Sequence, residues 1–97
     1  MPYGILFGEK ALSRIPDSLP PEVLDEFEAA LQSLARDPLN LGQRTTFPYP
    51  PRGKMFPFHV DHAGIRHYFV AFFVFTPGER NILIFSVTYD ASPWRGD

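Results

Sequence analysis

The clearest pattern of apolar and polar positions along the chain is helical and runs from residue 20 to residue 36. Val23, Phe27, Leu31 and Leu34 recur at spacings of three and four, so they share one face of an α-helix. A proline near the start is tolerated in a first helical turn. The residue before Pro38 is disfavoured in the α conformation, which predicts that this helix stops there.

Two shorter elements are predicted ahead of this helix. Tyr3–Phe7 is apolar and of strand length. Glu9–Ile15 places its apolar residues on a single helical face, and Pro16 would end it. The N-terminal part of the chain is therefore expected to contain one strand and two helices.

The C-terminal half has the pattern of a β-meander. Met55–Val60, Ile65–Phe75 and Ile82–Tyr89 are runs of strand length, and turn-forming residues separate them. Ahead of them, Leu39–Gly53 is a connector whose proline-rich part, Phe47–Arg52, is expected to be stiff and extended. These elements predict an α+β fold with two N-terminal helices packed on an antiparallel sheet.

Both faces of the long strand Ile65–Phe75 are apolar beyond its first residues. Strands with this pattern are usually covered on both sides. One small helical layer can cover only one face, so a partner chain, curvature of the sheet or the proline-rich loop is expected to close the other.

Composition narrows the class of protein. The chain has 97 residues, which is one domain (1–97), and it lacks cysteine, which excludes a disulfide framework and cysteine-ligated zinc. No apolar run approaches the length of a membrane span, and the N-terminus lacks the features of a secretion signal, so a cytoplasmic protein is expected. The net charge of −2 argues against tight nucleic-acid binding through charge alone.

The order of these elements resembles the RelE/ParE superfamily of type II toxins. The likeness is carried by Phe7–Leu12, Leu19–Pro38, Phe58–Val60, Gly64–Tyr68 and Ile82–Tyr89. The resemblance implies a toxin silenced by an antitoxin that wraps the domain. RelE-like members cut mRNA on the ribosome without a metal, and ParE-like members block DNA gyrase.

The resemblance also implies a set of catalytic residues. Arg66 matches the arginine that contacts phosphate, for which the guanidinium fork is suited. His59 and Tyr89 are the candidates for proton transfer. The alternative for Arg66 is a structural ion pair with Asp61 or Asp90.

Further cations lie near these residues in the sequence. The candidates for substrate binding are Lys54, Arg52, His62 and His67. Two positions depart from the family pattern: Pro57 stands where a second lysine is expected, and Asp90 stands where an arginine is common. Both departures favour a non-catalytic member.

The histidines also raise the question of a metal site. The spacing His59-x-x-His62 spans a turn, and no cysteine assists it, so polar surface is the simpler interpretation. We therefore expect no metal and no cofactor.

The sequence thus predicts a toxin of a type II toxin–antitoxin system that cleaves mRNA. The alternative is a gyrase-directed toxin or a decayed protein-binding module. Expected partners are an antitoxin, the mRNA or ribosome and a second copy of the chain, with no membrane.

Overall fold

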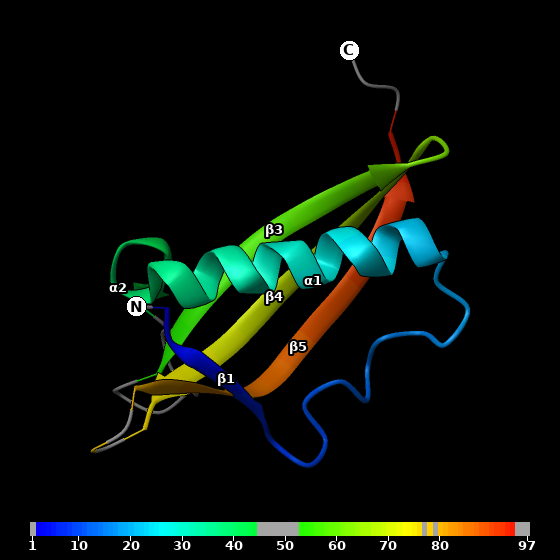
Figure 1. The fold of residues 1–97 in the computed structure, drawn as a ribbon. Helices are drawn as coiled ribbons and strands as arrows, with labels where there is room; N and C mark the ends of the chain where they lie inside the picture. Colours follow the sequence, from blue (N-terminus) through cyan, green and yellow to red (C-terminus); the bar gives the residue numbers. More distant parts are fainter. Residues whose placement is uncertain (1, 45–52, 77, 79, 95–97) are drawn as a thin grey trace.

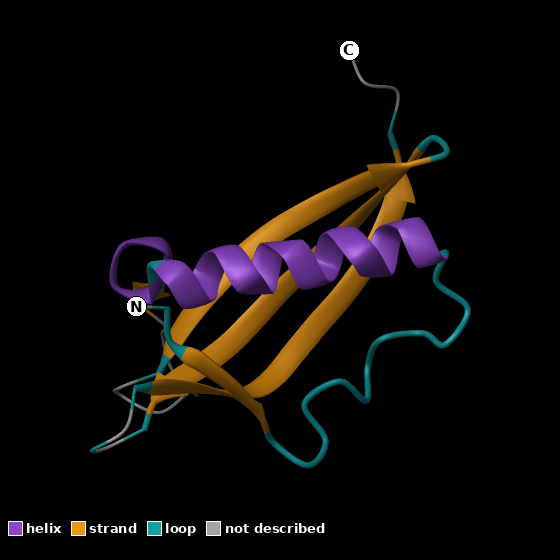
Figure 2. Cartoon of the chain, viewed as in Figure 1, coloured by secondary structure: helices purple, strands orange, loops and turns teal. Residues whose placement is uncertain are grey.

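The computed structural model describes residues 2–44, 53–76, 78 and 80–94, and its strands form one sheet in the order β1-β5-β4-β3-β2 (Figure 1). The elements are β1 (Gly4–Phe7), α1 (Pro21–Arg36), α2 (Pro38–Leu41), β2 (Gln43–Arg44), β3 (Lys54–His62), β4 (Ile65–Phe75) and β5 (Asn81–Pro93). Figure 2 shows α1 lying across one face of the strands. The predicted α+β class is confirmed.

Helix α1 forms where the apolar spacing predicts it. Val23, Phe27, Leu31 and Leu34 are all buried. Pro21 begins the helix in its first turn, where a missing N–H costs nothing, and Asp37 ends it. The buried stripe packs on the sheet, so burial rather than helix propensity alone stabilises this segment.

The predicted first helix, Glu9–Ile15, is wrong. Residues 9–14 form successive turns instead, with short-range bonds such as the Ala11 N–H donating to the Gly8 carbonyl at 3.1 Å. The Ala11 carbonyl accepts a hydrogen bond from the Val87 N–H at 3.0 Å. This short segment, ended by a proline, forms too few helical hydrogen bonds to offset the free-energy cost of helix nucleation. In addition, β5 binds the Ala11 carbonyl, which a helix would use for its own hydrogen bonds.

The sheet is mixed, whereas the sequence predicts an antiparallel one. Strand β1 pairs parallel to β5, with Ile5 opposite Ile82, while the other pairs are antiparallel. A parallel pair needs a long crossover, and everything between β1 and β5 in the chain supplies it. The missed pairing is therefore a long-range feature that no local pattern contains.

The predicted connector after α1 contains two small elements, α2 and β2. Gly42 lies between them, where an added Cβ would come within 2.6 Å of the Phe73 ring and 2.7 Å of the Pro38 carbonyl oxygen. Glycine therefore permits the close passage of the chain over Phe73. The proline-rich segment 47–52 lies outside the described residues.

A two-residue turn, Ala63-Gly64, joins β3 to β4. Both residues have positive φ angles, 51° and 77°, as a tight hairpin turn requires. This turn sets His62 opposite Ile65 and Asp61 opposite Arg66. Turn geometry thus fixes which side chains meet across the ladder.

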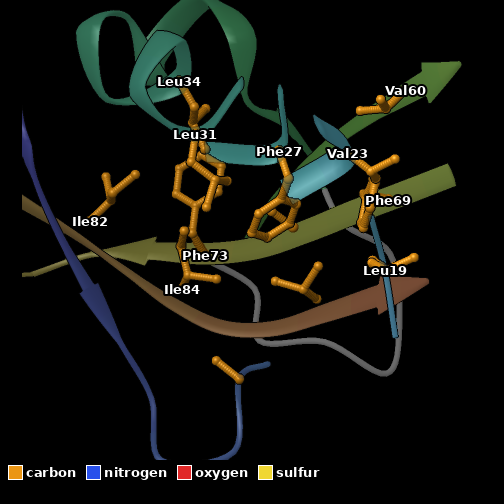
Figure 3. Packing of buried hydrophobic residues seen from close by; sticks show 13 residues of the cluster. Leu19, Val23, Phe27, Leu31, Leu34, Val60, Phe69, Phe73, Ile82 and Ile84 are labelled. Atoms are coloured by element: carbon orange, nitrogen blue, oxygen red, sulfur yellow. The ribbon is translucent and has the colours of Figure 1, made fainter. Parts of the chain in front are cut away.

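Alternation divides the side chains of β4 between two faces. The helix face carries His67, Phe69, Ala71 and Phe73, all of them buried. Figure 3 shows Phe69 and Phe73 beneath α1. The distal face carries Arg66, Tyr68, Val70 and Phe72. On the distal face Phe72 is buried, whereas Tyr68 is 41% exposed.

The core lies between α1 and the helix face (Figure 3). The ring of Phe27 lies 4.9 Å from that of Phe69 and 5.8 Å from that of Phe58, centroid to centroid. Ile82 and Ile84 of β5 complete the cluster. None of the helices in the described part of the chain is long and apolar enough to cross a membrane.

Candidate functional site

Arg66 lies on the distal face, paired with the residue that the hairpin register sets opposite it. Its Nε–H donates to Asp61 Oδ1 at 2.7 Å and its Nη2–H donates to Asp61 Oδ2 at 3.0 Å. This bidentate hydrogen bond, aided by the opposite charge, lowers the pKa of Asp61 and raises that of Arg66. The structure thus shows the ion pair of Arg66 with Asp61, which the sequence offers as an alternative to a catalytic role.

The guanidinium of Arg66 also stacks on an aromatic ring. Its Cζ lies 3.9 Å from the centroid of the Trp94 ring, within range of a cation–π interaction. The backbone N–H of Trp94 donates to the Gly64 carbonyl at 2.9 Å, which anchors the end of β5 to the hairpin turn. Tyr68 on the same face adds to the raised pKa of Arg66.

His59 shares the distal face with Arg66, and Asp61 lies between them along β3. The His59 Nε2 atom lies 3.9 Å from Asp61 Oδ2, which is too far for a hydrogen bond. Its side chain is 49% exposed, and its ring lies beside that of Tyr68, its partner across the ladder. The structure therefore brings His59 and Arg66 to one exposed patch.

Tyr89 lies on the helix face and does not join them. Its Oη lies 2.7 Å from Nδ1 of His67, and the two rings stack with centroids 5.8 Å apart. His67 is only 5% exposed. Burial raises the pKa of Tyr89, and the charge of Asp90 adds to this effect. Two of the predicted site residues, the buried His67 and the partly buried Tyr89, thus pair on the opposite side of the sheet from Arg66.

The remaining predicted residues are scattered. Lys54 pairs with Phe73 at the far end of β3, five positions from His59, about 16 Å along a strand. His62 pairs with Ile65 on the helix-face side of the hairpin. Arg52 lies outside the described residues.

The His59-x-x-His62 spacing does not converge on a metal. The two residues are an odd number of positions apart on one strand, so their side chains leave opposite faces. Among the residues that the structure describes, no three histidine, aspartate or glutamate side chains gather closely enough to hold an ion.

The distal-face patch therefore contains Arg66, Asp61, Tyr68, Trp94 and His59. A guanidinium and an imidazole on an exposed surface can bind one phosphate and move one proton. The carboxylate of Asp61 accepts two hydrogen bonds from this guanidinium. Sequence reasoning missed Trp94 because it ended the last strand at Tyr89, whereas β5 continues to Pro93 and carries Trp94 to the hairpin.

Comparison with known proteins adds a structural relative. No protein-family model and no curated protein matches the sequence. The fold is similar to a chain of the RelBE2 toxin–antitoxin complex from Mycobacterium tuberculosis, with a TM-score of 0.59 and 21% sequence identity. The match covers 93% of this chain and 100% of that chain. The chain thus has the fold of a component of a RelBE toxin–antitoxin complex, in agreement with the resemblance that its sequence indicates.

Proposed function

We propose that this protein is the toxin of a type II toxin–antitoxin system and that a partner antitoxin holds it inactive. The observation that supports this most directly is the likeness of nearly the whole chain to a component of a toxin–antitoxin complex. The sequence resemblance to RelE/ParE toxins supports it independently of that structure.

The proposed activity is cleavage of mRNA, carried out on the distal face. His59 would take the proton from a ribose 2′-hydroxyl, and the resulting oxygen would attack the adjacent phosphorus. The bond to the 5′-oxygen would break, and this oxygen would take a proton from water, leaving a 2′,3′-cyclic phosphate and a 5′-hydroxyl. Arg66 would stabilise the negative charge that develops on the phosphate oxygens. His59 and Arg66 are the two predicted catalytic residues that share a face.

A non-catalytic toxin, directed at gyrase or another protein, is the second candidate. Two observations favour it: Asp61 holds the guanidinium of Arg66 at 2.7 and 3.0 Å, and Tyr89 is on the opposite face with His67. A patch of this kind is suited to binding a polypeptide as well as an RNA strand.

The antitoxin is expected to occupy exposed apolar surface. Leu6 and Phe7 on β1, with Leu12 in the turn that follows, are 45%, 46% and 40% exposed. Apolar residues clustered at a sheet edge are typical of protein-binding surfaces. Size-exclusion chromatography with light scattering, with and without the product of the adjacent reading frame, would reveal a stable complex or a homodimer.

Induced expression in bacterial cells separates the two candidates. Rapid arrest of translation would support mRNA cleavage, whereas filamentation with DNA damage would support a gyrase target. In both cases co-expression of the antitoxin should restore growth. Normal growth of cells that accumulate the folded protein would overturn the toxin proposal.

A further inference from the structure

Arg66 has two close contacts that use different parts of its guanidinium. Asp61 accepts hydrogen bonds from Nε–H and Nη2–H, which form one edge of the fork. The Cζ atom of Arg66 also lies over the ring of Trp94, 3.9 Å from the ring centroid. The hydrogen bonds to Asp61 use N–H donors of Arg66, whereas the contact with the Trp94 ring uses none of them.

We propose that Asp61 competes with phosphate for the guanidinium of Arg66 and that Trp94 is a positioning residue for this guanidinium. The proposal rests on the proposed function in that the phosphate is taken to belong to a single-stranded RNA. Removing Asp61 should therefore strengthen phosphate binding, whereas removing Trp94 should weaken it.

Asp61 and a phosphate would bind the same edge of the Arg66 guanidinium. A phosphate binds arginine best through two parallel N–H···O bonds, and the Nε/Nη2 edge offers such a pair. The carboxylate of Asp61 occupies that edge in the same bidentate manner. The lowered pKa of Asp61 keeps it ionised at neutral pH, so a phosphate approaching Arg66 would also meet a like charge.

Trp94 is held close to Arg66 by a hydrogen bond of its own backbone. Its backbone N–H bonds to the Gly64 carbonyl at 2.9 Å, directly at the turn of the β3–β4 hairpin. The backbone of Trp94 is therefore anchored beside the start of β4, from which Arg66 projects, and this places the ring within reach of the guanidinium. Stacking of this kind restricts the guanidinium plane without using its donors, so less freedom is lost when a phosphate binds.

The test measures ligand binding to the full-length protein. Binding is monitored through the NMR signal of the Arg66 Nε–H group. The probes are inorganic phosphate and a short single-stranded RNA oligonucleotide. Asp61→Asn should bind both probes about fivefold more tightly than the wild type does, because the substitution removes an exposed ion pair that binding would have to break. Trp94→Ala should bind about threefold more weakly, and Trp94→Phe, which keeps a ring, should lie between Trp94→Ala and the wild type.

Asp90→Asn is the matched control. Asp90 lies opposite Tyr68 on the distal face and carries the same charge as Asp61, and its Oδ1 accepts a hydrogen bond from the Ala91 N–H at 2.9 Å. If competition at the fork matters, Asp61→Asn strengthens binding several times more than Asp90→Asn does. Equal gains in the two variants would reduce the effect to net charge and overturn the proposal.

Two further results would also overturn the proposal. One is wild-type affinity in a folded Trp94→Ala protein. The other is a lack of response to either probe in every variant. Failure of the proposed function looks different, because opposite effects of Asp61→Asn and Trp94→Ala on binding can persist in a protein that does not arrest growth. Response to inorganic phosphate without response to RNA would contradict the RNA ligand.

Discussion

The Oη atom of Tyr89 and the Nδ1 atom of His67 lie 2.7 Å apart on the helix face, while Arg66, the residue before His67, projects from the distal face. Two candidates for one active site are therefore separated by the thickness of the sheet. Tyr89 is better explained as the hydrogen-bonding partner of a buried histidine than as a proton donor beside Arg66.

Tyr89→Phe should accordingly act on stability. Removing the hydroxyl leaves the buried His67 nitrogen without this partner, at a cost of about 1–2 kcal/mol. Urea unfolding measures the loss. Tyr68→Phe removes a hydroxyl from an exposed position and should cost less than about 0.5 kcal/mol. A Tyr89→Phe protein of wild-type stability that has lost toxicity would give Tyr89 a direct role in activity.

Phe27→Ala should reveal how strongly α1 is held to the sheet. Phe27 is 6% exposed and contacts the rings of Phe58 and Phe69, so truncation should destabilise the protein by about 3–5 kcal/mol. Leu24 is on the same helix but 39% exposed, and Leu24→Ala should change stability by less than about 0.5 kcal/mol. Comparable effects of the two substitutions in denaturant unfolding would refute this packing.

The β3–β4 turn provides a pair of substitutions with opposite signs. Ala63 has a φ of 51°, which is unfavourable for a residue with a Cβ, so Ala63→Gly should stabilise the protein by about 1 kcal/mol. Gly64 has a φ of 77° and open space around its Cα, so Gly64→Ala should destabilise it through backbone strain alone. Thermal unfolding compares the two, and destabilisation by Ala63→Gly would contradict the turn geometry.

Asp61 should make stability depend on pH in the acid range. Its pKa is lowered from 3.8 by the hydrogen bond and charge of Arg66, so the folded state holds its proton more weakly than the unfolded state. The stabilisation is therefore present above the ordinary carboxyl range and is lost as the pH falls through the lowered pKa. Carboxyl NMR titration measures the shift, and Arg66→Ala should return Asp61 towards 3.8. An unchanged titration in Arg66→Ala would contradict the ion pair.

Local patterns predicted the elements that depend on local rules. The stripe from Val23 to Leu34 fixed α1, and the strand Ile65–Phe75 was predicted with the bounds that the structure has. The first strand of the meander was predicted to end at Val60, whereas β3 continues to His62, and this longer strand sets Asp61 opposite Arg66. Turns replaced the predicted helix at Glu9–Ile15 because that segment uses the Ala11 carbonyl to pair with β5, a contact distant in sequence.

The candidate site was predictable only in part for the same reason. His59 and Arg66 share a face because alternation and one tight turn decide it. The separation of Tyr89 from Arg66 follows from the register between β4 and β5, which depends on a bulge between Phe72 and Phe73 and on a long turn. Trp94 reaches Arg66 because β5 extends to Pro93, beyond the end that its apolar pattern predicts.

In the proposed function, the protein arrests translation through Arg66 and an antitoxin prevents the arrest. The most direct test is the rate of protein synthesis in pulse-labelled bacterial cells after induction of the wild type or Arg66→Ala, matched for amount and melting temperature. We expect that synthesis stops within minutes in the wild type, continues in Arg66→Ala and recovers when the adjacent reading frame is co-expressed. Continued synthesis with the wild type, or an equal arrest by Arg66→Ala, would contradict it.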